Sequence, residues 1–238
     1  MLYFLSKFFL SYFDSFNKKK VIKFFEGKIN KNISVLIDVG SHHGETIYTF
    51  KKNFKIKKIL AFEPSIINFE ILKSKTKNLS NLKIYNIALG DKDGWVNLKQ
   101  HYDSESSTIN EINTDSKYYK KKNLYLDFFD LKNKSFPSTK VKIDRLDNIL
   151  ESESISSIDI LKIDTEGYDY YVIKGLGRLI KNVKFIYFEH HFHSMLRKNY
   201  TYGDVENFLK KNNFKKVFKT KMFFRKTFEY IYINNSIN

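Results

Sequence analysis

The chain of 238 residues contains no cysteine, two prolines, one tryptophan and nine glycines. Without cysteine, a disulfide framework, a thiolate metal site and a cysteine nucleophile are all excluded. The absence fits a reducing compartment, and we expect a cytoplasmic protein. The scarcity of proline and glycine leaves no linker of that composition, so nothing divides the chain, and its length suits one substantial domain.

Acidic residues are also few. The chain has 26 Asp and Glu and 42 Lys and Arg, which gives a net charge of +16. Such an excess can indicate nucleic-acid or acidic-membrane binding. However, the lysines are spread along the chain, with short runs only at 18–20 and 120–122. Abundant Lys, Asn, Ile, Phe and Tyr is also typical of an A/T-rich coding bias. We therefore expect a solvated basic surface, and no nucleic-acid partner.

Long apolar runs are missing from the aromatic-rich N-terminus, where Lys7, Asp14 and Asn17 interrupt residues 1–25. No span approaches the ~20 apolar residues of a transmembrane helix, and no basic residue precedes the short apolar run as in a signal peptide. We expect residues 1–30 to form a helical extension that packs on a domain spanning 31–238. A helix on the membrane surface, giving peripheral membrane contact, is the alternative.

From residue 35 onward, apolar runs alternate with helical patterns. The run Val-Leu-Ile-Asp-Val at 35–39 has almost no polar alternation, which is typical of a strand buried on both faces of a parallel sheet. Further strands are predicted at 58–62, 82–88, 95–99, 141–143, 158–163, 183–188, 214–219 and 228–233, and helices at 45–53, 66–77, 146–150, 168–176 and 202–211. This order predicts an α/β, doubly wound domain. Residues 100–140 are irregular and form either a functional insertion or a mobile loop.

Polar residues follow these strands at their carboxyl ends, where open α/β sheets bind ligands. Gly40 and Gly44 after the first strand allow a tight turn and close approach of the backbone to a ligand. Glu63 after the second strand can accept both hydroxyls of a ribose. The other strand-end residues are Asp38, Asn86, Ala88, Asp164, Glu166, Glu189 and His190.

The most specific segment is Leu-Lys-Ile-Asp-Thr-Glu-Gly at 161–167, and it is the last of an ordered set. The others are Asp-Val-Gly-Ser-His-His-Gly at 38–44, Phe-Glu-Pro at 62–64, Asn-Ile-Ala-Leu at 86–89 and Ser106-Ser107. Together they resemble the successive motifs of the FkbM-type S-adenosylmethionine-dependent methyltransferases over about residues 33–234. The resemblance implies a Rossmann-like, mostly parallel seven-stranded sheet with an antiparallel last strand, the class I methyltransferase fold. It also implies O-methylation, often of sugars or small-molecule hydroxyls.

Carried over by position, the resemblance implies that Asp38, Gly40 and Gly44 hold the methionine part of S-adenosylmethionine, with Ser41 in the same site. Glu63 then holds the ribose, and Asn86 and Ala88 lie near the adenine. The family commonly has Ala-Asn-Ile between its two glycines, whereas this chain has Ser-His-His at 41–43. The backbone of the turn should keep its role, but contacts of its central side chain should differ.

Methyl transfer from a sulfonium requires an aligned acceptor oxygen and a base that removes its proton. We expect Asp164 to face the cofactor or the acceptor, and Glu166 to bind a substrate hydroxyl or a metal. His190 or His191 is expected to line the acceptor pocket. Because residues two apart share a strand face, His191 could also join Glu189 or His193 around a divalent ion. Hydrogen-bonded histidines without a metal are the preferred interpretation, so no metal is assigned.

Three alternatives compete with a methyltransferase for a hydroxyl of a sugar, glycan or related small molecule. Nicotinamide-dependent oxidoreductases usually have Gly-x-Gly-x-x-Gly, and position 42 is His. A nucleic-acid methyltransferase fits the charge, but amino-methylating members usually carry a Pro-Pro-aromatic motif where this chain has 164–167. A non-catalytic glycan- or membrane-binding module fits the changed turn at 41–43, while the retained carboxylates argue against it.

Overall fold

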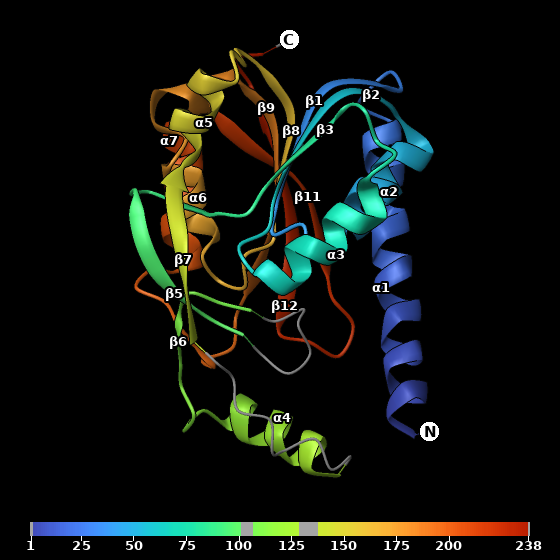
Figure 1. Ribbon diagram of the computed structural model, residues 1–238, viewed down its shortest axis with the longest axis vertical. Helices are drawn as coiled ribbons and strands as arrows, with labels where there is room; N and C mark the ends of the chain where they lie inside the picture. The colour runs from blue at the N-terminus through green and yellow to red at the C-terminus, as the bar shows by residue number, and fades with distance from the viewer. Residues whose placement is uncertain (1, 101–106, 129–137, 238) are drawn as a thin grey trace.

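The computed structural model describes residues 2–100, 107–128 and 138–237, so Ser106 lies outside the described residues. A seven-stranded sheet forms its centre (Figure 1). The strand order is β11-β12-β9-β8-β1-β2-β3. These strands are β1 (Asn32–Val39), β2 (Lys55–Phe62), β3 (Leu82–Tyr85), β8 (Ile158–Ile163), β9 (Val183–His191), β11 (Phe214–Lys221) and β12 (Thr227–Asn234).

The five strands from β3 to β9 run parallel, whereas β12 is antiparallel to both of its neighbours, β9 and β11. The last four residues of β1, β2 and β8 are buried, as expected for apolar strands covered on both faces. The predicted fold class, a mostly parallel seven-stranded sheet with an antiparallel last strand, is confirmed.

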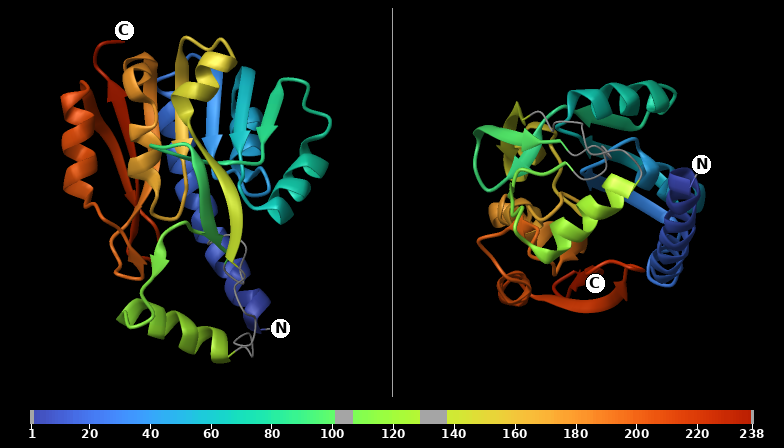
Figure 2. Two further views of the ribbon diagram at one scale, coloured as in Figure 1. Left: turned by 60° about the vertical axis from the view of Figure 1, so that its left-hand side comes forward. Right: turned by 90° about the horizontal axis from the view of Figure 1, so that it is seen from below.

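Helices cover both faces of the sheet, so the molecule has three layers (Figures 1 and 2). One face carries α1 (Leu2–Glu26), α2 (Glu45–Asn53) and α3 (Ile66–Thr76), and the other carries α5 (Leu146–Ser152), α6 (Asp169–Lys174), the 3₁₀ helix η1 (Gly177–Asn182) and α7 (Tyr202–Lys211). Phe25, Phe50 and Leu72 pack in the core on the first face. Val172 and Leu209 pack in the core on the second. Because successive strand residues point to opposite faces, each buried strand contributes side chains to both cores.

A second sheet of three strands has the order β4-β7-β5. Its members are β4 (Ala88–Gly90), β5 (Gly94–Lys99) and β7 (Ser138–Arg145). The prediction of one strand over 82–88 is therefore wrong, because β3 ends at Tyr85 and Ala88 belongs to the other sheet. Asn86 marks the break, since its side-chain amide donates to the carbonyls of Glu63 at 2.9 Å and Pro64 at 3.1 Å. These two hydrogen bonds hold the chain at residue 86 against the end of β2.

Residues 107–128 contain two elements where the sequence predicted little regular structure. The short strand β6 (Glu111–Ile112) pairs with β10 (Leu196–Arg197), and the helix α4 (Lys117–Phe128) follows. Figures 1 and 2 show α4 lying beyond the carboxyl ends of the parallel strands. None of the helices in the described residues combines the length and apolar composition that a membrane crossing requires.

Candidate active site

A cavity of about 1070 Å³ opens at the carboxyl ends of the parallel strands. Its walls come mainly from α1, the β1–α2 loop with α2, the end of β2, β4, the β8–α6 loop, the end of β9, α4 and the β11–β12 turn. Small-molecule pockets usually measure about 300–1,000 Å³. The space is therefore sufficient for a cofactor and an acceptor side by side.

Gly40, in the β1–α2 loop, is required by a contact within the protein. Its φ is +78°, and a Cβ at this position would lie 1.8 Å from the carbonyl oxygen of Asp164. Gly44, with φ +89°, precedes α2, and a Cβ at this position would lie 3.1 Å from Cδ1 of Leu72. Close approach of the backbone to a ligand at these two glycines stays a prediction. Gly40 and Ser41 still line the cavity.

Glu63 stands in the cavity wall at the end of β2 and is only 4% exposed. Its carboxylate accepts hydrogen bonds from two backbone amides, that of His42 at 2.8 Å and that of Ser65 at 3.0 Å. Burial raises the pKa of Glu63 to about 7, although these bonds oppose the rise. The two amides, together with a hydrogen bond from the Asn68 side chain, fix the orientation of the carboxylate.

The residues predicted near the adenine separate in the structure. Ala88 lines the cavity together with Ile87 and Leu89, which gives an apolar surface. Asn86 is outside the cavity lining, because its side-chain amide is bound to backbone carbonyls at the β2 end.

A buried lysine lies between two of the predicted carboxylates. Lys162 on β8 is the direct neighbour of Asp38 on β1. Its Nζ lies 3.6 Å from Oδ1 of Asp38 and 3.1 Å from Oδ2 of Asp164. Burial alone would lower the pKa of Lys162, but Asp164 and Asp38 raise it above its usual value. Lys162 is thus a fixed cation in the cavity wall.

The two carboxylates beside Lys162 differ in their surroundings. Asp38 is fully buried, and no hydrogen bond reaches either of its side-chain oxygens. Burial raises the pKa of Asp38 to about 6, although Lys162 opposes the rise. Asp164 is half-buried and lines the cavity. Burial also acts to raise its pKa, but the charge of Lys162 and its hydrogen bond prevail and lower it. Asp164 is therefore ionised, and Asp38 lies behind it.

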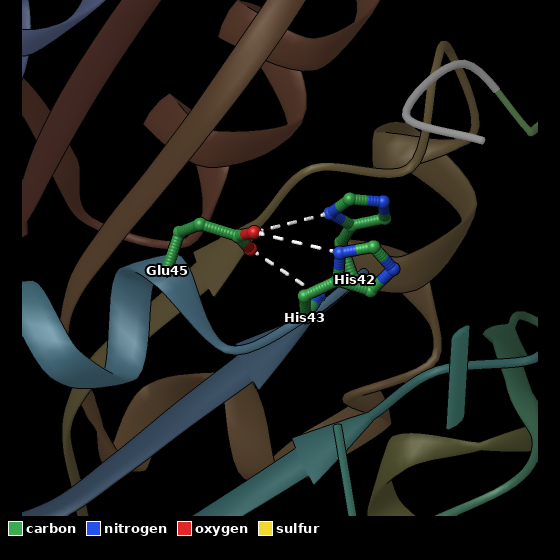
Figure 3. Close-up of side chains that lie close together, drawn as sticks. All are labelled: His42, His43 and Glu45. Carbon is green, nitrogen blue, oxygen red and sulfur yellow. Dashed lines mark hydrogen bonds and ion pairs between the residues drawn. The ribbon is translucent and has the colours of Figure 1, made fainter. Parts of the chain in front are cut away.

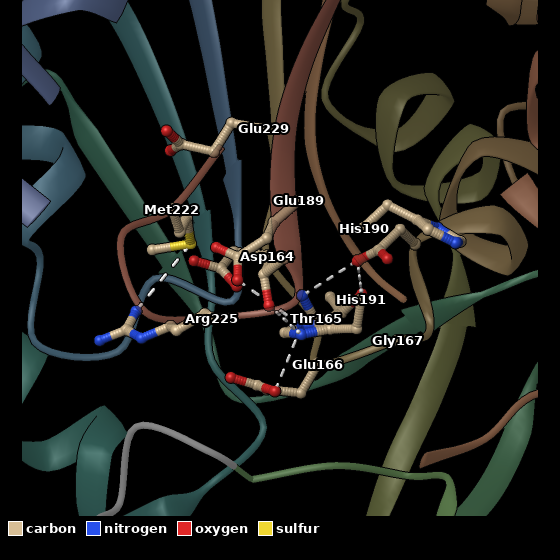
Figure 4. Close-up of polar contacts among 12 residues, drawn as sticks. Asp164, Thr165, Glu166, Gly167, Glu189, His190, His191, Met222, Arg225 and Glu229 are labelled. Atoms are coloured by element: carbon tan, nitrogen blue, oxygen red, sulfur yellow. Dashed lines mark hydrogen bonds and ion pairs between the residues drawn. The ribbon is translucent and has the colours of Figure 1, made fainter. Parts of the chain in front are cut away.

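The end of β9 contributes a histidine between carboxylates (Figure 4). Nδ1 of His191 lies 3.1 Å from Oγ1 of Thr227, and Nε2 lies 3.3 Å from Glu166 and 3.6 Å from Glu189. Burial, with the charge of His193, lowers the pKa of His191 to about 3, so its imidazole is neutral at pH 7. Burial, together with Asp164 and Glu166, raises the pKa of Glu189 well above its usual value.

His190 points to the opposite face of β9 and does not line the cavity (Figure 4). Its ring lies near Phe192, Tyr200 and Tyr202, and its Nε2 is 3.3 Å from Nζ of Lys198. The alternation of side chains along a strand separates it from His191. Of the two predicted histidines, only His191 meets the other site residues.

Sequence reasoning missed two contributors to the cavity. Lys162 was detectable as a charged residue inside an otherwise apolar strand. His193, which the sequence placed beside His191, lines the cavity and stacks its ring on Tyr118 of α4 at 4.1 Å. The second missed contributor is a basic rim, formed by lysine and arginine side chains of α4 and the β11–β12 turn. Its members are Lys117, Lys121, Lys122, Arg225 and Lys226.

Comparison with known proteins identifies relatives of the chain. The profile of the Methyltransferase FkbM domain matches residues 38–216, and no curated protein matches. Among solved structures, Methyltransferase FkbM from Methylobacillus flagellatus KT is similar, with a TM-score of 0.55, 13% identity and coverage of 85% of this chain. The match covers 44% of that protein, so this chain spans less than half of its length.

Two further structures show the same fold. Magnesium protoporphyrin IX methyltransferase (ChlM) from Synechocystis PCC 6803, solved with bound S-adenosylmethionine, has a TM-score of 0.53 and 7% identity, over 94% of this chain and 80% of that chain. The N-methyltransferase NodS from Bradyrhizobium japonicum WM9 has a TM-score of 0.51 and 8% identity, over 93% and 96% of the two chains. At such low identity, these likenesses show the fold alone.

Proposed function

Because this chain belongs to the family of FkbM methyltransferases, we propose that it transfers the methyl group of S-adenosylmethionine to a hydroxyl of a sugar, glycan or related small molecule. The observation that carries the hydroxyl acceptor is the cluster of Asp164, Glu166, Glu189 and His191 at one end of the cavity. A hydroxyl must be aligned by hydrogen-bond acceptors and must lose its proton during transfer. Three carboxyl groups and a neutral imidazole supply both functions.

The residues at the other end of the cavity fit the cofactor. Glu63 offers a fixed carboxylate at the end of the second strand, where related folds bind ribose hydroxyls. Ile87, Ala88 and Leu89 form an apolar wall suited to the adenine. The carboxylates of the cavity also favour a sulfonium cation. When bound, S-adenosylmethionine supplies an activated methyl group, and the protein supplies binding and orientation.

Three predicted cofactor residues then act indirectly. Asp38 holds Lys162 in place, Asn86 fixes the end of β2, and Gly44 sets the start of α2. Gly40 and Ser41 remain in the wall of the cofactor end.

His191 is the proposed general base. Its neutral imidazole is held by Thr227 on one nitrogen and faces Glu166 and Glu189 with the other. A pKa of about 3 makes it a weak base, but the acceptor hydroxyl becomes strongly acidic as the methyl group is transferred, so its proton can pass to Nε2, where Glu166 stabilises the resulting charge. Glu166 binds the acceptor hydroxyl, and Asp164, kept ionised by Lys162, orients the cofactor or the acceptor.

Calorimetric titration with S-adenosylmethionine tests the cofactor site. We expect saturable binding by the wild type, weaker binding by Glu63→Ala, and unchanged binding by Glu70→Ala, which removes an exposed carboxylate on α3. Absence of binding by a folded wild type would contradict the proposal.

Methyl transfer to a panel of sugars and nucleotide sugars, followed as formation of S-adenosylhomocysteine, tests the base. His191→Gln should retain cofactor binding and lose about 10²–10⁴-fold in rate. His190→Gln alters the same strand on the opposite face and should keep its rate. Equal losses in both variants would remove His191 from the mechanism.

A nucleic-acid acceptor is the second candidate, favoured by the basic rim at the cavity mouth. Phosphates of an RNA strand would meet Lys117, Lys121 and Lys226 there. Methylation of RNA oligonucleotides with steep salt dependence, and of no sugar, would replace the sugar acceptor by RNA. Cofactor binding without transfer to any acceptor would favour a non-catalytic module.

A further inference from the structure

Three side chains of the β1–α2 loop converge on one point. His42, His43 and Glu45 each place one nitrogen or oxygen atom within 4.8 Å of the others. Oε1 of Glu45 lies 3.4 Å from Nδ1 of His42 and 3.9 Å from Nδ1 of His43. Figure 3 shows both imidazole rings directing a nitrogen toward the same carboxylate.

The backbone of the loop produces this convergence. His42 has a φ of +46°, in the left-handed region that a side chain of this size rarely adopts. As a result the two consecutive rings, which would point apart in an extended chain, lie stacked with centroids 3.6 Å apart. Backbone strain of this kind persists only where the surrounding structure holds it, and it is common at ligand sites.

A buried neighbour sets the protonation of the second ring. Nε2 of His43 lies 3.2 Å from Oδ1 of Asn68, which is 2% exposed. An amide oxygen only accepts hydrogen bonds, so Nε2 carries the proton and Nδ1 presents a lone pair toward Glu45. Metal-binding histidines are typically oriented in this way, by a hydrogen bond from the ring nitrogen that does not bind the metal.

We propose that His42, His43 and Glu45 bind a divalent transition-metal ion of the zinc type. Two imidazole nitrogens and one carboxylate oxygen are ligands that zinc accepts. Ligand atoms about 2.0–2.1 Å from a tetrahedral zinc lie roughly 3.3 Å apart. The three atoms here lie within 4.8 Å of one another, so binding requires them to close by up to about 1.5 Å and the two stacked rings to turn toward the ion. The charge of Glu45 offsets the positive end of α2 at this position. In the described part of the chain, no other trio of His, Asp and Glu brings its ligand atoms so close together.

The site does not depend on methyl transfer. Three protein ligands leave a fourth position, and His42 and Glu45 both line the cavity. The ion would therefore stabilise the loop that closes the cofactor end, and water or a bound oxygen group would complete its coordination.

The test is zinc titration of the chelator-treated full chain, followed by calorimetry, with Co²⁺ absorption as a report of coordination geometry. We expect one equivalent of zinc to bind to the wild type. Loss even of an outer partner of a metal ligand weakens binding about 10–100-fold, so His43→Ala and Glu45→Gln should each weaken it by at least that factor. Glu70→Gln, an exposed carboxylate on the neighbouring helix α3, should keep the wild-type affinity.

Thermal unfolding separates lost binding from lost folding. Zinc should raise the Tm of the wild type and of Glu70→Gln, but not the Tm of a folded His43→Ala protein. The proposal is overturned if the folded wild type binds no zinc. It is equally overturned if His43→Ala and Glu45→Gln bind as tightly as the wild type, or if only His191→Ala loses binding, which would place the ion at the end of β9.

Discussion

Replacement of Lys162 by methionine is the sharpest test of how the site is held together. The variant keeps an unbranched side chain of similar length but leaves Asp38 and Asp164 without their buried cation. Removing one partner of a buried ion pair costs about 3–5 kcal/mol. Asp38 should account for most of this loss, because it is fully buried and neither of its oxygens has a hydrogen-bond partner. At pH 8 we expect a loss near the lower end of this range, about 3 kcal/mol in the free energy of unfolding, because one proton over the two pH units above the wild-type pKa of about 6 is worth about 2.7 kcal/mol.

The loss should depend on pH with a defined sign. Burial raises the pKa of Asp38 from 3.8 to about 6 even beside Lys162, and without the lysine it must rise further. A carboxyl group whose pKa is raised in the folded state contributes its full stabilisation at pH values below its pKa in the unfolded chain. This contribution is lost as the pH rises through the folded pKa. The difference in the free energy of unfolding between variant and wild type should therefore be small near pH 5 and should increase above pH 6.

Urea denaturation at pH 5 and pH 8, followed by circular dichroism, measures both effects. Lys58→Met is the matched control, because Lys58 lies on β2 in a half-exposed pair with Glu153 at 3.0 Å, and such pairs contribute about 0–1 kcal/mol. Adding Asp38→Asn to Lys162→Met should restore part of the stability, since it removes the uncompensated charge. A loss below about 1 kcal/mol at pH 8, or an equal loss at both pH values, would refute the reasoning.

Two further predictions concern the backbone and one concerns a buried acid. Gly40→Ala should lower the Tm strongly, because its φ of +78° alone costs about 1–2 kcal/mol and its Cβ would meet the Asp164 carbonyl oxygen at 1.8 Å; an unchanged Tm would contradict this. Gly203→Ala, within α7 and with its nearest contact at 3.4 Å, should instead raise stability by about 0.5–1 kcal/mol. Burial raises the pKa of Asp169 from 3.8 to about 7, so the wild type should lose up to about 4 kcal/mol as the pH rises across this interval. Asp169→Asn does not ionise, and in urea denaturation its stability relative to wild type should increase from pH 5 to pH 8.

The fold was largely predictable because each strand carries its own signal. The apolar segments at 35–39 and 158–163 can be buried only in a sheet covered on both faces, and both are strands in the structure. The break between β3 and β4 was hidden, because it depends on side-chain bonds of Asn86 to a different part of the chain. Propensity along a sequence does not report such long-range hydrogen bonds.

The sequence predicted which strand ends contribute to the candidate site, but not how the charged side chains are arranged in it. Adjacent histidines cannot be assigned to faces until the end of β9 is known, and the structure separates His190 from His191 on that basis. Lys162 faces Asp38 only through the register of two strands far apart in the sequence. The contribution of α4 arises from a helix that residues 100–140 did not clearly indicate.

The position of β12 has a consequence for synthesis of the chain. Of the seven strands of the central sheet it is synthesised last, yet it pairs with β9 on one side and β11 on the other. Until residues 227–234 are available, a nascent chain has an unpaired edge on β9, whose residues 185–188 are apolar or aromatic and buried in the finished protein. Exposed edges of this kind pair readily with other chains. The central sheet should therefore depend most on chaperones in the interval before β12 is synthesised.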